Sequence, residues 1–224
     1  NAMVQRLASN DRDRATMLAG IAHDLKSPIT RLRLRLAGLG AGDEARRAEA
    51  DLDALERITA QFLLFAGGGD REGPVPLPLE QWLAELSAPL DPEQVQLDLV
   101  PLQACVQPTA LARAVGNLID NALSHGRPPL RLVLRPDGDA GSFRIEVWDQ
   151  GPGIAAEVWP QALQPFQRLD QARGGSGHCG LGLAIAARVA AAHGGGLEVQ
   201  RAASGFAVVL RGRSLAEGAA PPPG

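Results

Sequence analysis

The period of the hydrophobic pattern changes partway along the chain, and this change restricts the fold more than any other sequence feature. Between residues 12 and 66, apolar side chains recur at three- and four-residue steps, as in Met17, Ile21 and Leu25, which predicts amphipathic helices. A glycine-rich stretch follows at 67–73, and beyond it short alternating runs predict strands. The sequence therefore predicts a helical domain joined by a linker to a domain of mixed structure.

The helical part reads as a hairpin. Pro28 interrupts the first helix, and glycines 38, 40 and 42 form a turn before Asp43, which is a plausible N-cap for the second helix. A lone hairpin leaves its apolar stripe exposed to water, and pairing with a second copy as a four-helix bundle would bury it. Packing of the hairpin against its own C-terminal domain is the alternative, and we favour the dimeric bundle.

The second part predicts an α+β sandwich, because its strands and helices do not alternate regularly as βαβ units. Asp137-Gly138 lies between two alternating runs and indicates a β-hairpin. The glycine- and proline-rich segment 151–180 is long for a plain loop and is a candidate lid. The predicted helices are 79–86, 108–124 and 181–193, and the predicted strands are 95–100, 130–134, 143–148, 197–201 and 206–211.

Composition excludes several classes of protein. With 22 basic and 25 acidic residues and a net charge of −3, the chain lacks the basic field that nucleic acid binding requires. The two cysteines, Cys105 and Cys179, are far apart, which argues against a disulfide scaffold or a zinc module. Apolar runs fall short of the roughly 20 residues that span a bilayer. Residues 1–3 read as a scar of tag removal, so we expect a soluble fragment of a longer protein whose N-terminal part, including a membrane anchor, was cut away.

One candidate for chemistry is His23, which is followed by Asp24, Ser27 and Pro28 in the first predicted helix. A neutral imidazole is a good nucleophile toward phosphorus, and a neighbouring carboxylate can fix its tautomer and accept its proton. Ser27 lies one turn further on, close enough to position a water molecule. A histidine on a helix is more often structural, so this pattern alone decides nothing.

Two further patterns indicate a nucleotide. Asn117 and Asn121 are four residues apart and project from one helical face, and their amide oxygens suit Mg²⁺ that is already bound to phosphates. Asp149 follows a predicted strand and precedes Gly151 and Gly153, so the backbone there can approach a ligand closely, and the carboxylate can accept a hydrogen bond from an adenine amino group. Each pattern alone also fits two surface asparagines or a plain turn.

Glycines are dense at 174–182, just before a predicted helix. Their spacing formally matches a dinucleotide fingerprint, but the polar residues before them form no strand, which that fingerprint requires. A P-loop is excluded because Lys26, the only lysine, lies in the first helix. Glycine amides together with a helix N-terminus remain, and they form a ready site for an anion.

In their order along the chain, these patterns resemble the conserved boxes of sensor histidine kinases of two-component systems. The resemblance covers roughly residues 12–211, and residues 52–66 also resemble the second helix of that family's dimerisation domain. The matching boxes are H at 23–28, N at 117–121, G1 at 149–154, F at 165–168 and G2 at 180–183.

The resemblance implies an ATP-binding domain of the Bergerat fold, as in the GHKL group, and a protein-histidine kinase that uses ATP and Mg²⁺. By motif match His23 is the phosphoacceptor and Asp24 the general base, while Ser27 matches the hydroxyl position of a phosphatase motif. Family members autophosphorylate on histidine, pass the phosphoryl group to an aspartate of a response regulator and often dephosphorylate that regulator. The match thus also implies a homodimer, a response regulator as partner, and a bacterial inner-membrane sensor of which this chain is the cytoplasmic portion.

For the nucleotide site, the resemblance implies roles residue by residue. Asn121 is the principal Mg²⁺ ligand, assisted by Asn117, and Asp149 holds adenine in a pocket shaped by Gly151 and Gly153. The F box supplies Phe166 and Arg168, and G2 supplies Gly180, Leu181 and Gly182, of which the two glycines contact phosphates beneath a mobile lid.

Three positions depart from the family pattern. Ser124-His125 stand where Lys-Tyr is usual, so Arg127 and Arg168 are the candidates to replace a phosphate-binding cation. His178 stands where the first glycine of G2 belongs, so the family pattern does not determine the conformation of the lid here. Asp24 and Ser27 replace the commoner Glu and Thr, which is a conservative change.

Two other functions compete with the kinase: a GHKL ATPase or clamp in which no residue is phosphorylated, and a dimeric adaptor with an inactive nucleotide site. His23 within a dimerising hairpin argues against the clamp.

The motif matches set the expected domain boundaries. The expected segments are 1–11 as tag scar and entry, 12–66 for dimerisation and phosphotransfer, 67–73 as linker, 74–213 as catalytic ATP-binding domain, and 214–224 as disordered tail.

Overall fold

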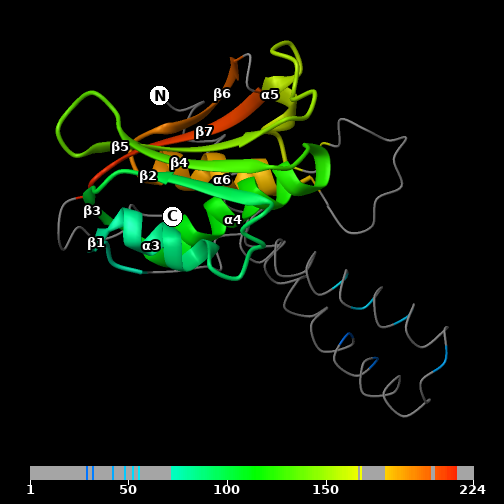
Figure 1. Ribbon diagram of the computed structural model, residues 1–224, viewed down its shortest axis with the longest axis horizontal. Coiled ribbons are helices and arrows are strands. Elements are labelled where there is room, and N and C mark those ends of the chain that lie inside the picture. Colours follow the sequence, from blue (N-terminus) through cyan, green and yellow to red (C-terminus); the bar gives the residue numbers. More distant parts are fainter. Residues whose placement is uncertain are drawn as a thin grey trace, which may run out of the picture. The chain divides into compact units, whose positions relative to one another are not determined.

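The computed structural model of the chain (Figure 1) divides into two compact units. One comprises residues 1–70, 170–181 and 224, and the other comprises residues 71–169 and 182–223. Within the described part, each helix is too short or too polar to traverse a bilayer. The structure describes residues 29, 32, 42, 48, 52, 55, 72–165, 167, 180–202 and 205–215.

In the first unit, the described positions of the N-terminal segment are mostly helical. Ile29 and Leu52 are buried, whereas Leu32 is 47% exposed and Leu55 is 46% exposed. The predicted helical hairpin and its bundle otherwise lie outside the described residues, as do the tag scar and most of the predicted linker.

The second unit is built on a five-stranded mixed sheet with the order β2-β4-β5-β7-β6. β2 pairs with β4 in parallel, and the other neighbours are antiparallel. A separate two-stranded antiparallel sheet joins β1 to β3. The strands are β1 (Val75–Pro78), β2 (Val95–Leu99), β3 (Gln103–Val106), β4 (Leu130–Pro136), β5 (Ser142–Asp149), β6 (Gly196–Ala202) and β7 (Gly205–Arg213).

The helices α3 (Leu79–Ser87), α4 (Pro108–His125) and α6 (Gly182–Ala192) cover one face of this sheet (Figure 1). The second unit also contains the short helix α5 (Trp159–Ala162). In α4, Pro108 occupies the first turn, where its missing N–H costs nothing, and apolar residues from Leu111 to Ala122 recur at helical spacing and are buried. Alternate residues of β5, including Phe143 and Ile145, meet them from the sheet. One hydrophobic core therefore fixes α4 against the strand that ends at Asp149.

The structure confirms an α/β sandwich, the predicted β-hairpin at Asp137-Gly138 and the predicted long helices of the second unit. The ends of these elements differ from the predicted ends by one or two residues. It corrects the prediction in three places, because β1, β3 and α5 were not expected. Val75–Pro78 contains two prolines and pairs only with β3, which is where a strand tolerates proline. The short helix α5 lies within segment 151–180, the candidate lid.

A buried histidine joins α6 to the start of α4. His193 is completely buried, its Nδ1 lies 2.9 Å from the carbonyl oxygen of Val189, and its Nε2 accepts the backbone N–H of Gln107 at 3.1 Å. This pattern fits only a neutral ring with its proton on Nδ1. Burial lowers the pKa of His193, and the Val189 hydrogen bond and the charge of Glu72 oppose that shift only in part.

We expect this histidine to make the second unit acid-sensitive. Because its folded pKa lies below the unfolded value of about 6.5, the unfolded chain binds more protons between the two values, and stability falls as the pH drops below about 6.5. Urea unfolding at pH 7.5, 6.5 and 5.5, followed by tryptophan fluorescence, measures this slope, since Trp82, Trp148 and Trp159 all lie in the second unit. His193→Gln should unfold more readily at pH 7.5 but show a flatter slope. An unchanged slope would contradict the assignment.

Candidate functional site

The site is centred on Asp149, the last residue of β5. Strand alternation places this side chain on the same face as Phe143, Ile145 and Val147, so it points into the molecule and is only 6% exposed. The carboxylate Oδ1 accepts the backbone N–H of Gly151 at 2.6 Å. A carboxylate can accept about four hydrogen bonds, so it has capacity left for a donor on a ligand.

The environment of Asp149 disfavours its charge. Burial raises the pKa of this carboxyl group, and hydrogen bonds from the backbone N–H groups of Gly151 and Arg127 lower the pKa by less. A buried carboxylate that is only partly compensated gains from a hydrogen-bond donor supplied by a ligand. This side chain is therefore suited to recognise an amino or amide N–H group.

The segment after α4 forms one wall beside this carboxylate. The backbone N–H of Gln150 donates to the carbonyl oxygen of Arg127 at 2.9 Å, which ties the turn after α4 to the turn after β5. Gly126, the C-cap of α4, lies so close that an added Cβ would stand 2.5 Å from Asp149 Oδ1. Only a residue without a side chain fits between the end of α4 and the carboxylate.

We expect Gly126→Ala to destabilise the protein by about 1–3 kcal/mol through overpacking. Its φ of −89° is open to alanine, so a loss would report the steric conflict with the Asp149 side chain and with the Ala122 carbonyl oxygen, which also stands 2.5 Å from an added Cβ. Gly116→Ala is the matched control, because it changes a glycine of the same helix that has no atom within 4 Å of an added Cβ. Removing a glycine from a helix interior should stabilise by about 0.5–1 kcal/mol. Urea unfolding measures both, and equal effects would refute this packing.

The loop after Asp149 forms the second wall. Gly153 has a φ of +65°, a conformation that favours glycine, and an added Cβ would stand 2.9 Å from Phe206 Cβ and closer still to its ring. Phe206 is buried in β7 and is the strand partner of Asp149. The loop is thus pressed against the same strand pair that positions the carboxylate.

Asn117 and Asn121 lie one turn apart on α4, and both are half-buried. Gly182, the first residue of α6, lies beside the first of them: an added Cβ would stand 3.5 Å from Asn117 Oδ1. Among the described residues, no three His, Cys, Asp or Glu side chains gather into a metal site. The two amide oxygens fit Mg²⁺ as hard ligands only if phosphates and water supply the rest of its shell.

Gly180 and Leu181 directly precede α6 in the chain. Gly180 has a φ of +69°, and Leu181 is completely buried. The other predicted site residues, His23, Asp24, Ser27, Phe166 and Arg168, lie outside the described residues. The structure thus brings Asp149, Gly151 and Gly153 together at one end of β5, and Asn117 next to Gly182.

Sequence reasoning missed Gly126, Phe206 and Arg201, whose guanidinium reaches the loop after Asp149. The end of a helix is often marked by glycine, so Gly126 could have been noticed as a C-cap. Nothing local in the sequence relates Phe206 or Arg201 to a loop some fifty residues earlier.

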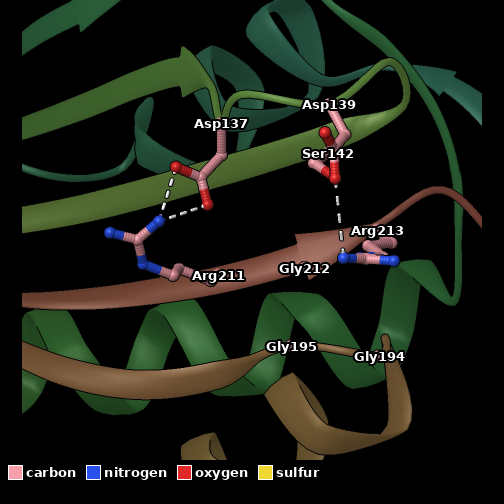
Figure 2. A pocket seen from close by; sticks show the side chains of 8 residues that line it. All are labelled: Asp137, Asp139, Ser142, Gly194, Gly195, Arg211, Gly212 and Arg213. Carbon is pink, nitrogen blue, oxygen red and sulfur yellow. Dashed lines mark hydrogen bonds and ion pairs between the residues drawn. The ribbon is translucent and has the colours of Figure 1, made fainter.

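A cavity of about 250 Å³ lies at the opposite end of β5, near Ser142 (Figure 2). With a rise of about 3.3 Å per residue, the seven steps of the strand separate it from Asp149 by roughly 23 Å. Two of its lining residues form an ion pair, because Arg211 Nη1 contacts both carboxylate oxygens of Asp137, at 2.6 and 2.5 Å, and Arg211 Nη2 also contacts Glu198 at 2.8 Å. This cavity is distinct from the site at Asp149.

Comparison with known proteins identifies related chains. The family described as "Histidine kinase-, DNA gyrase B-, and HSP90-like ATPase" matches residues 106–213. The chain is 32% identical over 209 residues to the sensor protein RstB of Escherichia coli, covering 87% of this chain and 47% of that protein. It is 34% identical over 217 residues to the sensor histidine kinase GtrS of Pseudomonas aeruginosa, covering 94% and 44%. The chain therefore spans about half the length of the curated relatives it matches.

Solved structures agree in fold. A structure of the mycobacterial sensor histidine kinase MprB has a TM-score of 0.50 and 28% identity, and the match covers 63% of this chain and 99% of that one. The crystal structure of full-length ShkA in complex with AMPPNP has a TM-score of 0.66 over 89% of this chain and 46% of that one, at 21% identity, which is a likeness of fold alone.

Proposed function

We propose that this chain, which belongs to the two-component sensor histidine kinases, binds ATP with Mg²⁺ at the Asp149 site. In this proposal the chain autophosphorylates His23 and then passes the phosphoryl group to an aspartate of a response regulator. The observation that carries the proposal is the buried Asp149 carboxylate, held between the turn after α4 and the loop after β5 with capacity for a further donor. The ordered motifs of the sequence supply the rest.

In the proposed complex, Asp149 accepts the adenine amino group, and Gly151 and Gly153 let the loop backbone lie close to the ring. Asn121 and Asn117 hold Mg²⁺ through their amide oxygens, and the ion neutralises part of the phosphate charge. We expect the backbone N–H groups of the first turn of α6, which follows Gly180 and Leu181, to bind phosphate oxygens, because helix N-termini bind anions. Phe166 and Arg168 complete the proposed nucleotide site.

In the proposed transfer, an imidazole nitrogen of His23 attacks the γ-phosphorus of ATP. The new N–P bond forms as the bond between the γ-phosphorus and the bridging oxygen breaks, and ADP leaves with the electron pair of that bond. Asp24 takes the proton of the attacking imidazole. Positioning and charge neutralisation account for most of the catalysis in transfers of this kind.

The partners follow from the same proposal. Leu32 and Leu55 are helical and about half exposed in a single chain, and a second copy packed as a four-helix bundle would cover such residues. Asp24 and Ser27 are the proposed residues for dephosphorylating the regulator. The complete protein is proposed to be an inner-membrane sensor with this part on the cytoplasmic side.

The test is incubation of the chain with γ-labelled ATP and Mg²⁺, followed by treatment of the labelled protein with acid or base. Phosphohistidine loses its phosphate in acid and phosphoserine does not, so we expect a label that acid removes and base leaves in place. ADP release without protein label would support the ATPase or clamp instead. Nucleotide affinity that is unchanged by Mg²⁺, with no label, would support the adaptor.

A further inference from the structure

Arg201, on the edge strand β6, reaches across to the loop that follows Asp149. Its Nη1 donates to the carbonyl oxygen of Pro152 and its Nη2 to that of Ile154, both at 3.1 Å. A guanidinium is planar and carries its donors in a fixed fork, so one side chain can bridge two carbonyls two residues apart. A lysine ammonium is a compact point charge and does not reproduce this geometry.

An aromatic ring completes the contact. The Arg201 guanidinium lies over the ring of Phe206, 5.3 Å from its centroid, and the two residues are partners in the β6–β7 register. Gly153 presses against the same ring from the loop. We call Arg201, Phe206 and the carbonyl groups of Pro152 and Ile154 the arginine clip.

The arginine clip acts on the segment next to the recognition carboxylate. Gly151, one residue before Pro152, donates its N–H to Asp149 at 2.6 Å, and Gln150 donates to the Arg127 carbonyl on the opposite wall. Fixing Pro152 and Ile154 therefore limits how far the loop can move away from the end of α4. A loop held in its binding conformation pays less ordering entropy when a ligand binds.

We propose that Arg201 is a positioning residue for nucleotide binding: through the arginine clip it holds the loop after Asp149 at the spacing that accepts adenine. This inference rests on the proposed function and adds to it a residue outside the family's boxes. Arg201 itself is exposed and touches only the loop and Phe206 in these contacts. Its loss should therefore affect affinity more than the global fold, because exposed polar contacts contribute little to stability.

The test compares ADP binding, by calorimetry on the full chain, for wild type, Arg201→Ala, Arg201→Lys and Arg213→Ala. Arg213 is a matched control, since it is an exposed strand arginine at the opposite end of the sheet. We expect Arg201→Ala to weaken ADP binding by about tenfold, the scale of one lost hydrogen bond, with an unchanged melting temperature. Arg201→Lys should recover only part of that loss, and Arg213→Ala should match wild type. In kinase assays KM for ATP should rise while kcat stays within about twofold.

Amide hydrogen exchange without nucleotide gives an independent readout. Arg201→Ala should speed exchange in the loop at 151–154 and leave the sheet interior unchanged. ADP affinity within twofold of wild type in Arg201→Ala, or an equal loss in Arg213→Ala, would overturn the inference and leave the proposed function standing. Failure of wild type to bind ADP would overturn both.

Discussion

Replacing His23 by glutamine should abolish protein labelling from γ-labelled ATP, while ADP affinity should stay within about twofold of wild type. The reason is chemical: a neutral imidazole nitrogen attacks phosphorus, and a carboxamide nitrogen of similar size does not. Asp149 and the residues that contact it, among them Gly126, Arg127 and Gly151, belong to the second unit, whereas His23 belongs to the first, so we expect nucleotide binding and phosphoryl transfer to separate. Label per chain, measured beside calorimetry with ADP, provides both quantities.

The chain has four histidines, which makes the control necessary. His125→Gln, at the exposed C-terminal end of α4, should retain labelling at saturating ATP. If label persisted in His23→Gln, the phosphoacceptor would be another residue and the proposed reaction at His23 would be wrong. Equal loss of label in His125→Gln would contradict the prediction that the loss is specific to His23.

Asp149→Asn should weaken ADP binding by about 10- to 150-fold. The variant replaces a charged acceptor by a neutral amide, and hydrogen bonds to charged groups contribute about 1.5–3 kcal/mol. Asp98→Asn is the control, because its carboxylate pairs with Arg135 on β4 at 2.6 Å and does not contact the site. Calorimetry with ADP measures both variants, and wild-type affinity in Asp149→Asn would remove the proposed recognition of adenine.

The same pair of variants has opposite effects on the pH dependence of stability. Burial raises the folded pKa of Asp149 above 3.8, so the native state binds more protons than the unfolded chain and stability falls as pH rises through that window. The hydrogen bond from Arg135 lowers the folded pKa of Asp98, so its contribution is lost as pH falls. We therefore expect the free energy of unfolding of Asp149→Asn, relative to that of wild type, to be larger at pH 7 than at pH 4. Urea unfolding without nucleotide measures this difference. Asp98→Asn should show the reverse trend.

Local patterns predicted the elements that carry the site. The helical spacing after Pro108 predicted α4, and the Asp137-Gly138 turn predicted the hairpin whose second strand ends at Asp149. These signals work because side-chain period and turn chemistry are properties of adjacent residues. The proline-rich β1 and the four-residue α5 escaped prediction, since both depend on contacts with distant segments more than on their own pattern.

The walls of the site could not be predicted in the same way. Gly126 is required because Asp149 packs against it, and Arg201 matters because it reaches a carbonyl 49 residues away. Such contacts arise only when the sheet brings β5, β6 and β7 side by side. The roles of His23, Asp24 and Ser27 stay predictions from sequence, because those residues lie outside the described part.

The central claim, that the nucleotide is held at the Asp149 end of the sheet, is tested most directly by amide hydrogen exchange of the full chain with and without ATP and Mg²⁺. We expect protection at residues 117–127, at 150–154 and at the first turn of α6. Exchange should remain unchanged around the cavity formed by residues 137–142, 194–195 and 211–213. Protection at that cavity, with none around Asp149, would contradict the claim.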